Sequence, residues 1–595
     1  MKERVTNSAF YSFYQRYFRH RLLFVAGLLA LIIFGVATGN INPYLYGKII
    51  DFITTGNLAS LRIYIVIYFF ATIVSAGLGM LEGYMGQIFS FVVTNEVKKE
   101  LFNKIMRMRF KRLDEYTVGE LISRLESDAD TVVGYYINVA TSIVMIIFNL
   151  IVSVYFVLAI STALSAVAVL FIPSTMIITL IYRKKFRKLA KKQKEFFDKY
   201  FGFVNESFSN IKGMRSYQLE DNIGEKFIKF IEKNLKLTKQ STKLENMMSV
   251  LNKLISTVFT LAIIYLSAIF IFEGKLTIGS MVAFNTYINK LFDAVSRILD
   301  LNIDAQNVAV CLGRIESIQK EPDEFQLYID DGKISWLPIE NIHINGLSFK
   351  YKEQYVLTGL SMHLSRPGFY GIVGKNGCGK STLAKLLIRF YDADEGAIQF
   401  NGVDQREFSL KYIRENITYI QKEVFITNDS LINNIKVANP EISDSEIIKA
   451  CERVGLSEIV ETLPDGYNTR LGENGSSLSS GQKQRINIAR ALIRKSSVIL
   501  LDEVTSDLDG KSEKEIVSLI HEMANQSLII FISHKLTSIV SSDKIFVMHH
   551  GVLQAQGTHE QLIAEDKLYQ DLFKQDEEDK KANAESGALE MLGCS

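Results

Sequence analysis

A nine-residue segment in the second half of the chain has the residue types and spacing that bind phosphate groups. Residues 374–382 read Gly-Lys-Asn-Gly-Cys-Gly-Lys-Ser-Thr, between an apolar run that predicts a buried strand and a run that predicts a helix. Glycine lets the backbone curl until its N–H groups point at the phosphates, and the helix N-terminus adds partial positive charge. We expect Lys380 to reach the outer phosphates and the Ser381 hydroxyl to bind Mg²⁺. The predicted nucleotide contacts in this loop are Gly374, Asn376, Gly377, Cys378, Gly379, Lys380, Ser381 and Thr382.

Two acidic residues and a histidine follow apolar runs farther along the chain. Residues 498–503 read Val-Ile-Leu-Leu-Asp-Glu, which predicts a buried strand ending in two carboxylates. Because this run comes about 120 residues after the phosphate loop, we expect Asp502 to help hold Mg²⁺. Glu503 would orient or activate the attacking water. His534 can hydrogen-bond the γ-phosphate and that water, although a histidine after a strand is more often structural when it occurs alone.

A second surface suited to anions precedes a helix predicted over residues 483–492. Leu478 and the four small or polar residues Ser479, Ser480, Gly481 and Gln482 lead into this helix. A helix N-terminus with small residues accepts an anion closely. One chain cannot easily apply this surface and the phosphate loop to the same nucleotide, whereas two chains packed head to tail can. The sequence therefore predicts a dimer with nucleotide at its interface.

The first 300 residues are dominated by apolar runs long enough to cross a bilayer, which takes about 20 residues. Residues 131–182 contain no charged side chain and are about twice as long as one span requires, so they predict two spans joined near Ile160-Ser161-Thr162. Asn42-Pro43 is expected to close the first span. The six predicted spans are 22–42, 63–81, two within 131–182, 254–272 and 278–298.

Basic residues mark one side of the predicted membrane domain. They cluster before the first span, after the second and after the fourth, at 183–192, which predicts that these segments and both termini are cytoplasmic. A nucleic-acid site at 183–192 is the poorer alternative. The long cytoplasmic segments predict helices that extend below the bilayer and turn near Gly119 and Gly213, where short helices could press on a cytoplasmic partner.

Length and composition limit the classes of protein to which the chain can belong. A chain of 595 residues is too long for one domain, and a formal charge of +2 gives no sign of nucleic-acid binding. Its 4 cysteines show neither disulfide-framework nor zinc-site spacing. We predict an all-α six-helix transmembrane domain over 1–320, a linker over 321–340, a cytosolic α/β P-loop ATPase domain over 341–573 and a disordered tail over 574–595.

With these motifs in place, the chain resembles an ABC exporter half-transporter of type IV, over residues 10–572. Leu478 to Gln482 resembles the family signature. The resemblance implies that Gln421 is the Q-loop glutamine, near metal and water, and that Tyr351 stacks on adenine. It further implies that Asp509 belongs to the D-loop and that His534 is the switch histidine. The catalytic set would be Glu503, His534 and Gln421, and the metal set Ser381, Gln421 and Asp502.

Some positions depart from the family pattern without removing a catalytic group. Ser480 stands where glycine is usual, and Asp507 where alanine is usual. The resemblance implies ATP-driven export of an amphiphilic peptide, lipid or drug across the cytoplasmic membrane by a homodimer, with ATP and Mg²⁺ as cofactors and no nucleic acid. A subunit of a heterodimeric exporter, or an ATP-gated channel or sensor, is the alternative. An importer is unexpected, because importers of this superfamily usually carry membrane domains on separate chains.

Overall fold

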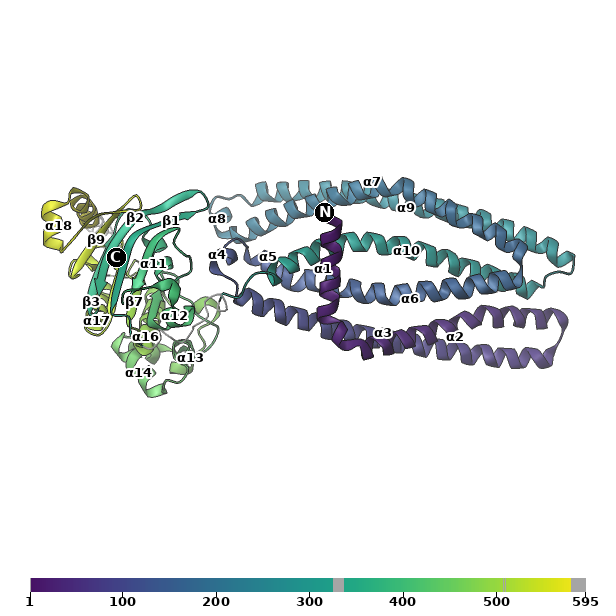
Figure 1. The fold of residues 1–595 in the computed structure, drawn as a ribbon, viewed down its shortest axis with the longest axis horizontal. Coiled ribbons are helices and arrows are strands. Elements are labelled where there is room, and N and C mark those ends of the chain that lie inside the picture. The colour runs from purple at the N-terminus through teal and green to yellow at the C-terminus, as the bar shows by residue number, and fades with distance from the viewer. Residues whose placement is uncertain (1, 325–336, 507, 509, 579–595) are drawn as a thin grey trace, which may run out of the picture. The chain divides into compact units, whose positions relative to one another are not determined.

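The computed structural model describes residues 2–324, 337–506, 508 and 510–578. The chain divides into two compact units (Figure 1). A helical unit contains Met1–Asn103 and Val118–Lys320, and a second unit contains Lys104–Thr117 together with Glu321–Ser595. The short segment Lys104–Thr117 therefore belongs with the C-terminal part of the chain. Asp507 and Asp509, both singled out from the sequence, lie outside the described residues.

Long helices build the first unit. Figure 1 shows α2 beside α3, α6 beside α10 and α7 beside α9. Shorter helices precede or connect them. The long helices are α2 (Leu22–Thr55), α3 (Leu58–Met106), α6 (Ala129–Ile160), α7 (Thr162–Ser209), α9 (Glu220–Phe272) and α10 (Ile278–Gln319). The shorter ones are α1 (Lys2–Tyr17), α4 (Phe110–Leu113), α5 (Val118–Ser123) and α8 (Ile211–Ser216).

Among the described residues, 4 helical stretches are long and apolar enough to cross a membrane. They are Arg19–Thr55, Leu58–Met106, Val118–Ile160 and Glu220–Phe272. The fourth predicted span falls on α7, many of whose side chains lie outside the described set, and the sixth falls on α10. The unit is thus a helical membrane domain.

The turn expected near Ile160-Ser161-Thr162 is present. Helix α6 ends at Ile160, and Ser161 is extended, with φ −162° and ψ 116°. Its hydroxyl accepts a hydrogen bond from the Leu164 backbone N–H at 3.4 Å, which caps α7. A serine in this position satisfies one of the free donors at a helix N-terminus. The prediction of two helices separated by a tight turn is confirmed.

The expectation that Pro43 closes the first apolar helix is wrong, because α2 continues through Pro43 to Thr55. Proline has no N–H to donate to the carbonyl four residues earlier, here that of Gly39. The neighbouring helix α10 supplies donors instead. Lys290 Nζ donates to the Gly39 carbonyl at 3.0 Å, and the Tyr287 hydroxyl donates to the Asn40 carbonyl at 2.7 Å. A proline is tolerated inside a membrane helix when a neighbour satisfies the carbonyl that it frees, as Lys290 does here for Gly39.

The second unit contains two sheets. One has the strand order β2-β1-β4-β5 and is antiparallel, and the other has the order β10-β9-β3-β8-β7-β6 and is parallel except for β10. The strands are β1 (Asn341–Tyr351), β2 (Gln354–Ser365), β3 (Gly368–Val373), β4 (Glu395–Phe400), β5 (Val403–Asp404), β6 (Ile417–Ile420), β7 (Val498–Asp502), β8 (Leu528–Ile532), β9 (Lys544–His549) and β10 (Val552–Gly557).

Helices accompany these sheets, and apolar strands form the centre. Every residue of β7 and β8 is buried, as expected for parallel strands covered on both faces. The helices are α11 (Lys380–Leu387), α12 (Leu410–Asn416), α13 (Leu431–Lys436), α14 (Asp444–Arg453), α15 (Ser457–Thr462), α16 (Ser480–Arg494), α17 (Gly510–Ala524) and α18 (His559–Glu565). This unit has the α/β class predicted from the sequence.

Helix α4 packs within this second unit. Phe110 stacks on Phe390 with ring centroids 4.3 Å apart and meets Tyr391 edge-on at 5.9 Å. The Tyr391 hydroxyl donates to the Asp114 carboxylate. Short helices do form at Gly119 and Gly213, as α5 and α8, but both belong to the helical unit. The segment that packs on the α/β core is Phe110–Asp114, which precedes the region singled out from the sequence.

Candidate functional site

Three parallel strands bring the predicted catalytic residues to one edge of the sheet. Ile372 of β3 pairs with Ile532 of β8, and Ile532 pairs with Asp502 of β7. The residues that follow these strands therefore emerge side by side at the carboxyl edge, which is where ligands bind in open α/β sheets. The phosphate loop follows β3, Glu503 follows β7, and His534 follows β8 by two residues.

The phosphate loop needs glycine at two places for steric reasons. Gly374 has φ +153°, and a Cβ there would overlap the Met548 carbonyl oxygen and lie 2.7 Å from Cys378 Sγ. Gly379 has φ +105°, and a Cβ there would lie 2.6 Å from Leu357 Cδ2. Gly379 is also the residue before α11, so the left-handed turn directs the helix N-terminus into the loop. The sequence prediction of a strand, a loop and a helix in this order is confirmed.

Lys380 is held over the loop by main-chain oxygens. Its ammonium donates to the carbonyls of Gly374 at 2.8 Å and Lys375 at 3.3 Å, and the side chain is only 4 % exposed. Burial lowers the pKa of Lys380, while Cys378, Glu503 and Asp502 act in the opposite direction. Burial also raises the pKa of the Cys378 thiol, so this cysteine stays protonated at neutral pH. Lys380 is thus a confined cation that an anionic phosphate would stabilise.

Asp502 and Ser381 form a pair of oxygen ligands suited to Mg²⁺. The Ser381 hydroxyl donates to Asp502 Oδ1 at 3.2 Å. Burial raises the pKa of Asp502, and hydrogen bonds from Tyr419 and Ser381 oppose that rise. Among the described residues, no three His, Cys, Asp or Glu side chains gather as a metal site. Mg²⁺ is usually bound by one or two protein oxygens together with substrate phosphates and water, and the Ser381–Asp502 pair offers oxygens of this kind.

Glu503 and His534 are in contact. His534 Nε2 and the Glu503 carboxylate form a short polar contact, and the Glu503 N–H donates to the Ile532 carbonyl at 2.9 Å. Burial, with a contribution from Lys380, lowers the pKa of His534, so it is neutral at pH 7. Glu503 has φ +56°, a left-handed conformation that costs roughly 1 kcal/mol for a residue with a side chain. Such strain at the end of a strand is typical of functional residues.

The signature segment forms a capped helix start. Ser479 caps α16: its hydroxyl accepts from the Gln482 N–H at 3.3 Å, and its own N–H donates to Gln482 Oε1 at 2.9 Å. This capping box explains why α16 begins at Ser480, three residues before the predicted start at 483. Ser479 and Ser480 are exposed and Gly481 is half-buried. Within the described residues, no hydrogen bond joins this helix start to the phosphate loop of the same chain.

The other two predicted contacts lie at strand ends. Gln421 directly follows β6, whose last residue Ile420 pairs with Leu501, so Gln421 is adjacent to Asp502 in the sheet and is exposed. Tyr351 ends β1 and packs edge-on against Phe349 at 4.9 Å and Tyr391 at 5.3 Å. Thr382 is buried in α11, whereas Asn376 and Gly377 are exposed at the loop tip.

Comparison with known families matches both units. Residues 24–295 match the model described as the ABC transporter transmembrane region, and residues 357–506 match the model described as ABC transporter. The two matches occur in one chain, in the order of a membrane domain followed by its ATP-binding domain.

The chain belongs to the ABC transporters.

Relatives of similar length support this membership. A protein of Rickettsia bellii named putative export ATP-binding/permease protein is 29 % identical over 81 % of this chain and 84 % of its own length. A protein of Syntrophus aciditrophicus named ATP-dependent lipid A-core flippase is 26 % identical over 94 % and 93 %. The solved structure of a bacterial Atm1-family ABC exporter with ATP bound superposes with a TM-score of 0.81 over 93 % of this chain and 98 % of that one, at 23 % identity. This ABC half-transporter is an ATPase coupled to transport.

Tyr419 contacts one of the predicted site residues, and sequence reasoning missed it. It lies on β6 beside Leu500 of β7, and its hydroxyl donates to Asp502 Oδ2 at 2.9 Å. Asp502 therefore receives two hydroxyl hydrogen bonds, one on each oxygen, because Ser381 donates to Oδ1. The signal available in the sequence was a tyrosine two residues before Gln421, in the short strand β6.

Lys535, the residue after His534, connects the His534 turn to its surroundings. Its ammonium donates to the Thr505 carbonyl at 3.1 Å and to Glu513 Oε2 at 3.2 Å. Thr505 lies in the segment after Glu503 and is 1 % exposed. In this ABC transporter the Lys535 ammonium thus links the His534 turn both to the chain beyond Glu503 and to the buried Glu513 carboxylate on α17.

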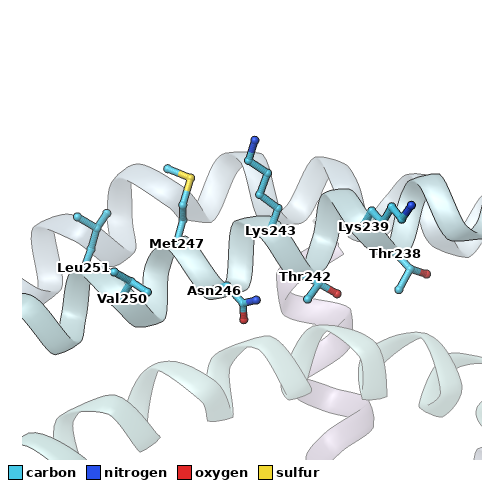
Figure 2. Close-up of a pocket in the computed structure, with 8 residues that line it drawn as sticks. All are labelled: Thr238, Lys239, Thr242, Lys243, Asn246, Met247, Val250 and Leu251. Carbon is cyan, nitrogen blue, oxygen red and sulfur yellow. The ribbon is translucent and has the colours of Figure 1, made fainter.

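Hollows lined by described residues lie in the helical unit, and two of them are considerable in size. The larger, about 670 Å³, is lined by residues of α9 alone (Figure 2). Figure 2 shows Thr242 and Asn246 pointing to one side of α9 and Lys243 pointing to the opposite side. Residues of one helix cannot enclose a ligand. The smaller hollow is lined by residues of the three helices α2, α6 and α10.

We predict that Tyr419→Phe raises the Mg²⁺ concentration needed for half-maximal ATP hydrolysis by roughly tenfold, the effect of losing one hydrogen bond to a charged group. The ring, and therefore strand packing, is kept. Titration of ATPase activity with Mg²⁺ at saturating ATP measures the change. Tyr412→Phe is the matched control, because Tyr412 donates its hydroxyl to the Leu337 carbonyl instead. Equal Mg²⁺ requirements in Tyr419→Phe and wild type would contradict the role given to this hydroxyl.

Proposed function

We propose that two copies of this chain form an exporter that moves an amphiphilic peptide, lipid or drug across the cytoplasmic membrane, driven by ATP. The observation that carries the proposal is the meeting of Lys380, Asp502 and the Glu503–His534 pair at one sheet edge, in a chain whose other unit is built from apolar helices. The names of the relatives, an export protein and a lipid flippase, support export and a lipid-like cargo.

We assign the residues of the ATP site as follows. Lys380 and the backbone N–H groups of the loop bind the phosphates, and Tyr351 stacks on adenine. Ser381, Asp502 and Gln421 would hold Mg²⁺, which would neutralise charge on the phosphates. Glu503 orients the attacking water and accepts its proton, and neutral His534 holds Glu503 in place through Nε2. The exposed start of α16, with Ser479 to Gln482, would complete the site on the partner copy.

The dimer follows from the incomplete site of one copy. The signature helix start is exposed and makes no hydrogen bond to the phosphate loop of its own chain within the described residues. Closure of two copies on ATP would bury both surfaces. Because the contacts to ATP are stronger in the closed dimer, ATP shifts the population toward that state, and hydrolysis reverses the shift.

Segment Phe110–Asp114 is our candidate for passing this motion to the helices. It belongs to the loop between α3 and α5 and packs on the α/β core through Phe390 and Tyr391. Tyr391 also contacts Tyr351, the proposed adenine-stacking residue, with ring centroids 5.3 Å apart. One aromatic ring therefore touches both the proposed nucleotide contact and the segment that leads into the membrane unit.

Reconstitution into proteoliposomes tests the proposal. We expect ATP-dependent movement of one or more of three probes: nitrobenzoxadiazole-labelled phosphatidylethanolamine, Hoechst 33342 and a dansylated decapeptide. The same vesicles distinguish the alternatives. Ion current across a bilayer without probe movement would indicate a channel, and a purified chain that is inactive and monomeric would indicate a missing second subunit.

We predict that Glu503→Gln keeps ATP binding but lowers hydrolysis at least about 100-fold, the lower range for loss of a general base. Equilibrium binding of labelled ATP and phosphate release measure the two effects separately. Glu461→Gln, an exposed acid on α15, is the control and should hydrolyse normally. Wild-type turnover by Glu503→Gln would remove the assigned role.

We predict that Phe110→Ala separates hydrolysis from transport. The variant should keep ATPase activity within about twofold, because Phe110 lies outside the catalytic edge, and lose roughly tenfold in probe movement as stacking on Phe390 is lost. Phe110→Tyr retains the ring and should restore movement. If Phe110→Ala lowers the rate of ATP hydrolysis and the rate of probe transport by the same factor, segment Phe110–Asp114 supports the folding of the ATPase unit and does not transmit motion.

A further inference from the structure

A cavity of about 270 Å³ lies among α2, α6 and α10 of the helical unit. Its polar lining comprises Asn40, Asn149, Lys290, Asp293 and Arg297, and its apolar lining includes Met145 and Ile146. Drug-sized ligands usually occupy about 300–1,000 Å³. The cavity therefore suits the headgroup of an amphiphile more than a whole molecule.

The Lys290 ammonium is fixed in the wall of this cavity. It donates to the Gly39 carbonyl and to Asn40 Oδ1, both at 3.0 Å. The Gly39 carbonyl is available because Pro43, four residues on, has no N–H to give it. An ammonium carries three N–H donors, so these two bonds leave one for another acceptor.

Asn40 cannot turn away to release Lys290. Its side-chain Nδ2 donates to the Val36 carbonyl and to Asn149 Oδ1, both at 2.8 Å, and its own carbonyl accepts from Tyr287. The residue is 2 % exposed. Every polar group of the Asn40 side chain is thus engaged, and the position of the ammonium is set before any ligand arrives, which reduces the entropic cost of binding.

The charged groups of the cavity leave an excess of positive charge. Lys290 is half-buried and forms no ion pair with an acid within the described residues. The lining acid is Asp293 and the second cation is Arg297, both exposed. A cation on a membrane helix is costly unless it meets an opposite charge, and such residues mark ligand paths.

We propose that this cavity binds the anionic headgroup, a phosphate or carboxylate, of the amphiphile that the transporter carries, with Lys290 as the central contact. The identity of the ligand as cargo rests on the proposed export function, whereas binding itself does not require ATP. The apolar lining of Met145 and Ile146 continues from the charged groups and contacts the adjoining part of the ligand. Arg297 adds a second cation and Asp293 moderates the net charge.

Binding to the purified full-length chain in a non-ionic detergent tests the proposal. The probes are lysophosphatidic acid and lysophosphatidylcholine with the same fluorescent acyl chain, followed by anisotropy without ATP. We expect Lys290→Gln to weaken binding of lysophosphatidic acid roughly tenfold and to change binding of lysophosphatidylcholine less than about twofold. Lys290→Arg should retain most of the preference. Lys48→Gln on α2 is the matched control, since Lys48 lies outside the cavity.

A second variant does not depend on the packing of α2 against α10. Asp293 is exposed, so Asp293→Asn removes the lining acid without disturbing the core, and we expect lysophosphatidic acid to bind about threefold more tightly. Competition with inorganic phosphate separates the sources of the anion. Displacement of the probe by low millimolar phosphate would assign the cavity to free phosphate and overturn the amphiphile.

The proposal fails if wild type does not prefer lysophosphatidic acid, or if Lys290→Gln weakens both probes alike or neither. A different experimental result would contradict the proposed export function. Selective, Lys290-dependent binding in a protein that moves no probe in ATP-loaded vesicles would leave the anion site standing and remove export. If instead Lys290→Gln leaves the transport of every anionic probe unchanged, the export function stands and the assignment of Lys290 to the cargo site fails.

Discussion

The register of β3, β8 and β7 is the constraint on which the ATP site depends. Ile372, Ile532 and Asp502 lie at the same level of the parallel sheet, so the phosphate loop, His534 and Glu503 leave it at one edge. Parallel strands hold this register because both faces are buried. A shift of one residue would reverse the faces of β7 and carry the carboxylate of Asp502 away from Ser381. Apolar packing of the strands therefore sets the positions of the site residues, although the apolar side chains take no part in the chemistry.

Charge within that edge is balanced by neighbours. Lys380 donates to two backbone carbonyls, Asp502 accepts from two hydroxyls, and Glu503 contacts His534. Each of these three charged side chains therefore has a polar partner. Each of these groups carries interactions that a triphosphate, a metal ion or a water could replace or extend. The helical unit follows the same rule at Pro43, where Lys290 supplies to the Gly39 carbonyl the donor that the helix lacks. In both units, a polar group without a hydrogen-bond partner in its own helix or strand receives one from a neighbouring element.

The sequence predicted those features of the fold that depend on residues close to one another in the chain. The phosphate loop, the turn near Ser161 and the α/β class of the second unit were predicted from glycine spacing, from the length of an uncharged run and from alternating strand-like and helix-like segments, and all three are present. Contacts between distant segments were not predictable. Nothing near Tyr419 in sequence shows that its hydroxyl reaches Asp502, 83 residues away, and nothing near Phe110 shows that it stacks on Phe390. Pro43 was misjudged for the same reason, because Lys290, 251 residues after Gly39, satisfies the carbonyl that proline leaves free.

The aromatic group around Tyr391 shows how binding and motion can share one element. Tyr391 is 5 % exposed, meets Tyr351 and Phe110 edge-on, and donates its hydroxyl to Asp114. A ring packed so tightly cannot adjust to one neighbour without disturbing the others, because close-packed interiors transmit displacement. If Tyr351 moves when it stacks on adenine, Tyr391 must move or rotate, and its hydroxyl then changes its distance from Asp114. The segment 110–114 would thus respond to the nucleotide base as well as to closure of the dimer, which links occupancy of the site to the helices before hydrolysis begins.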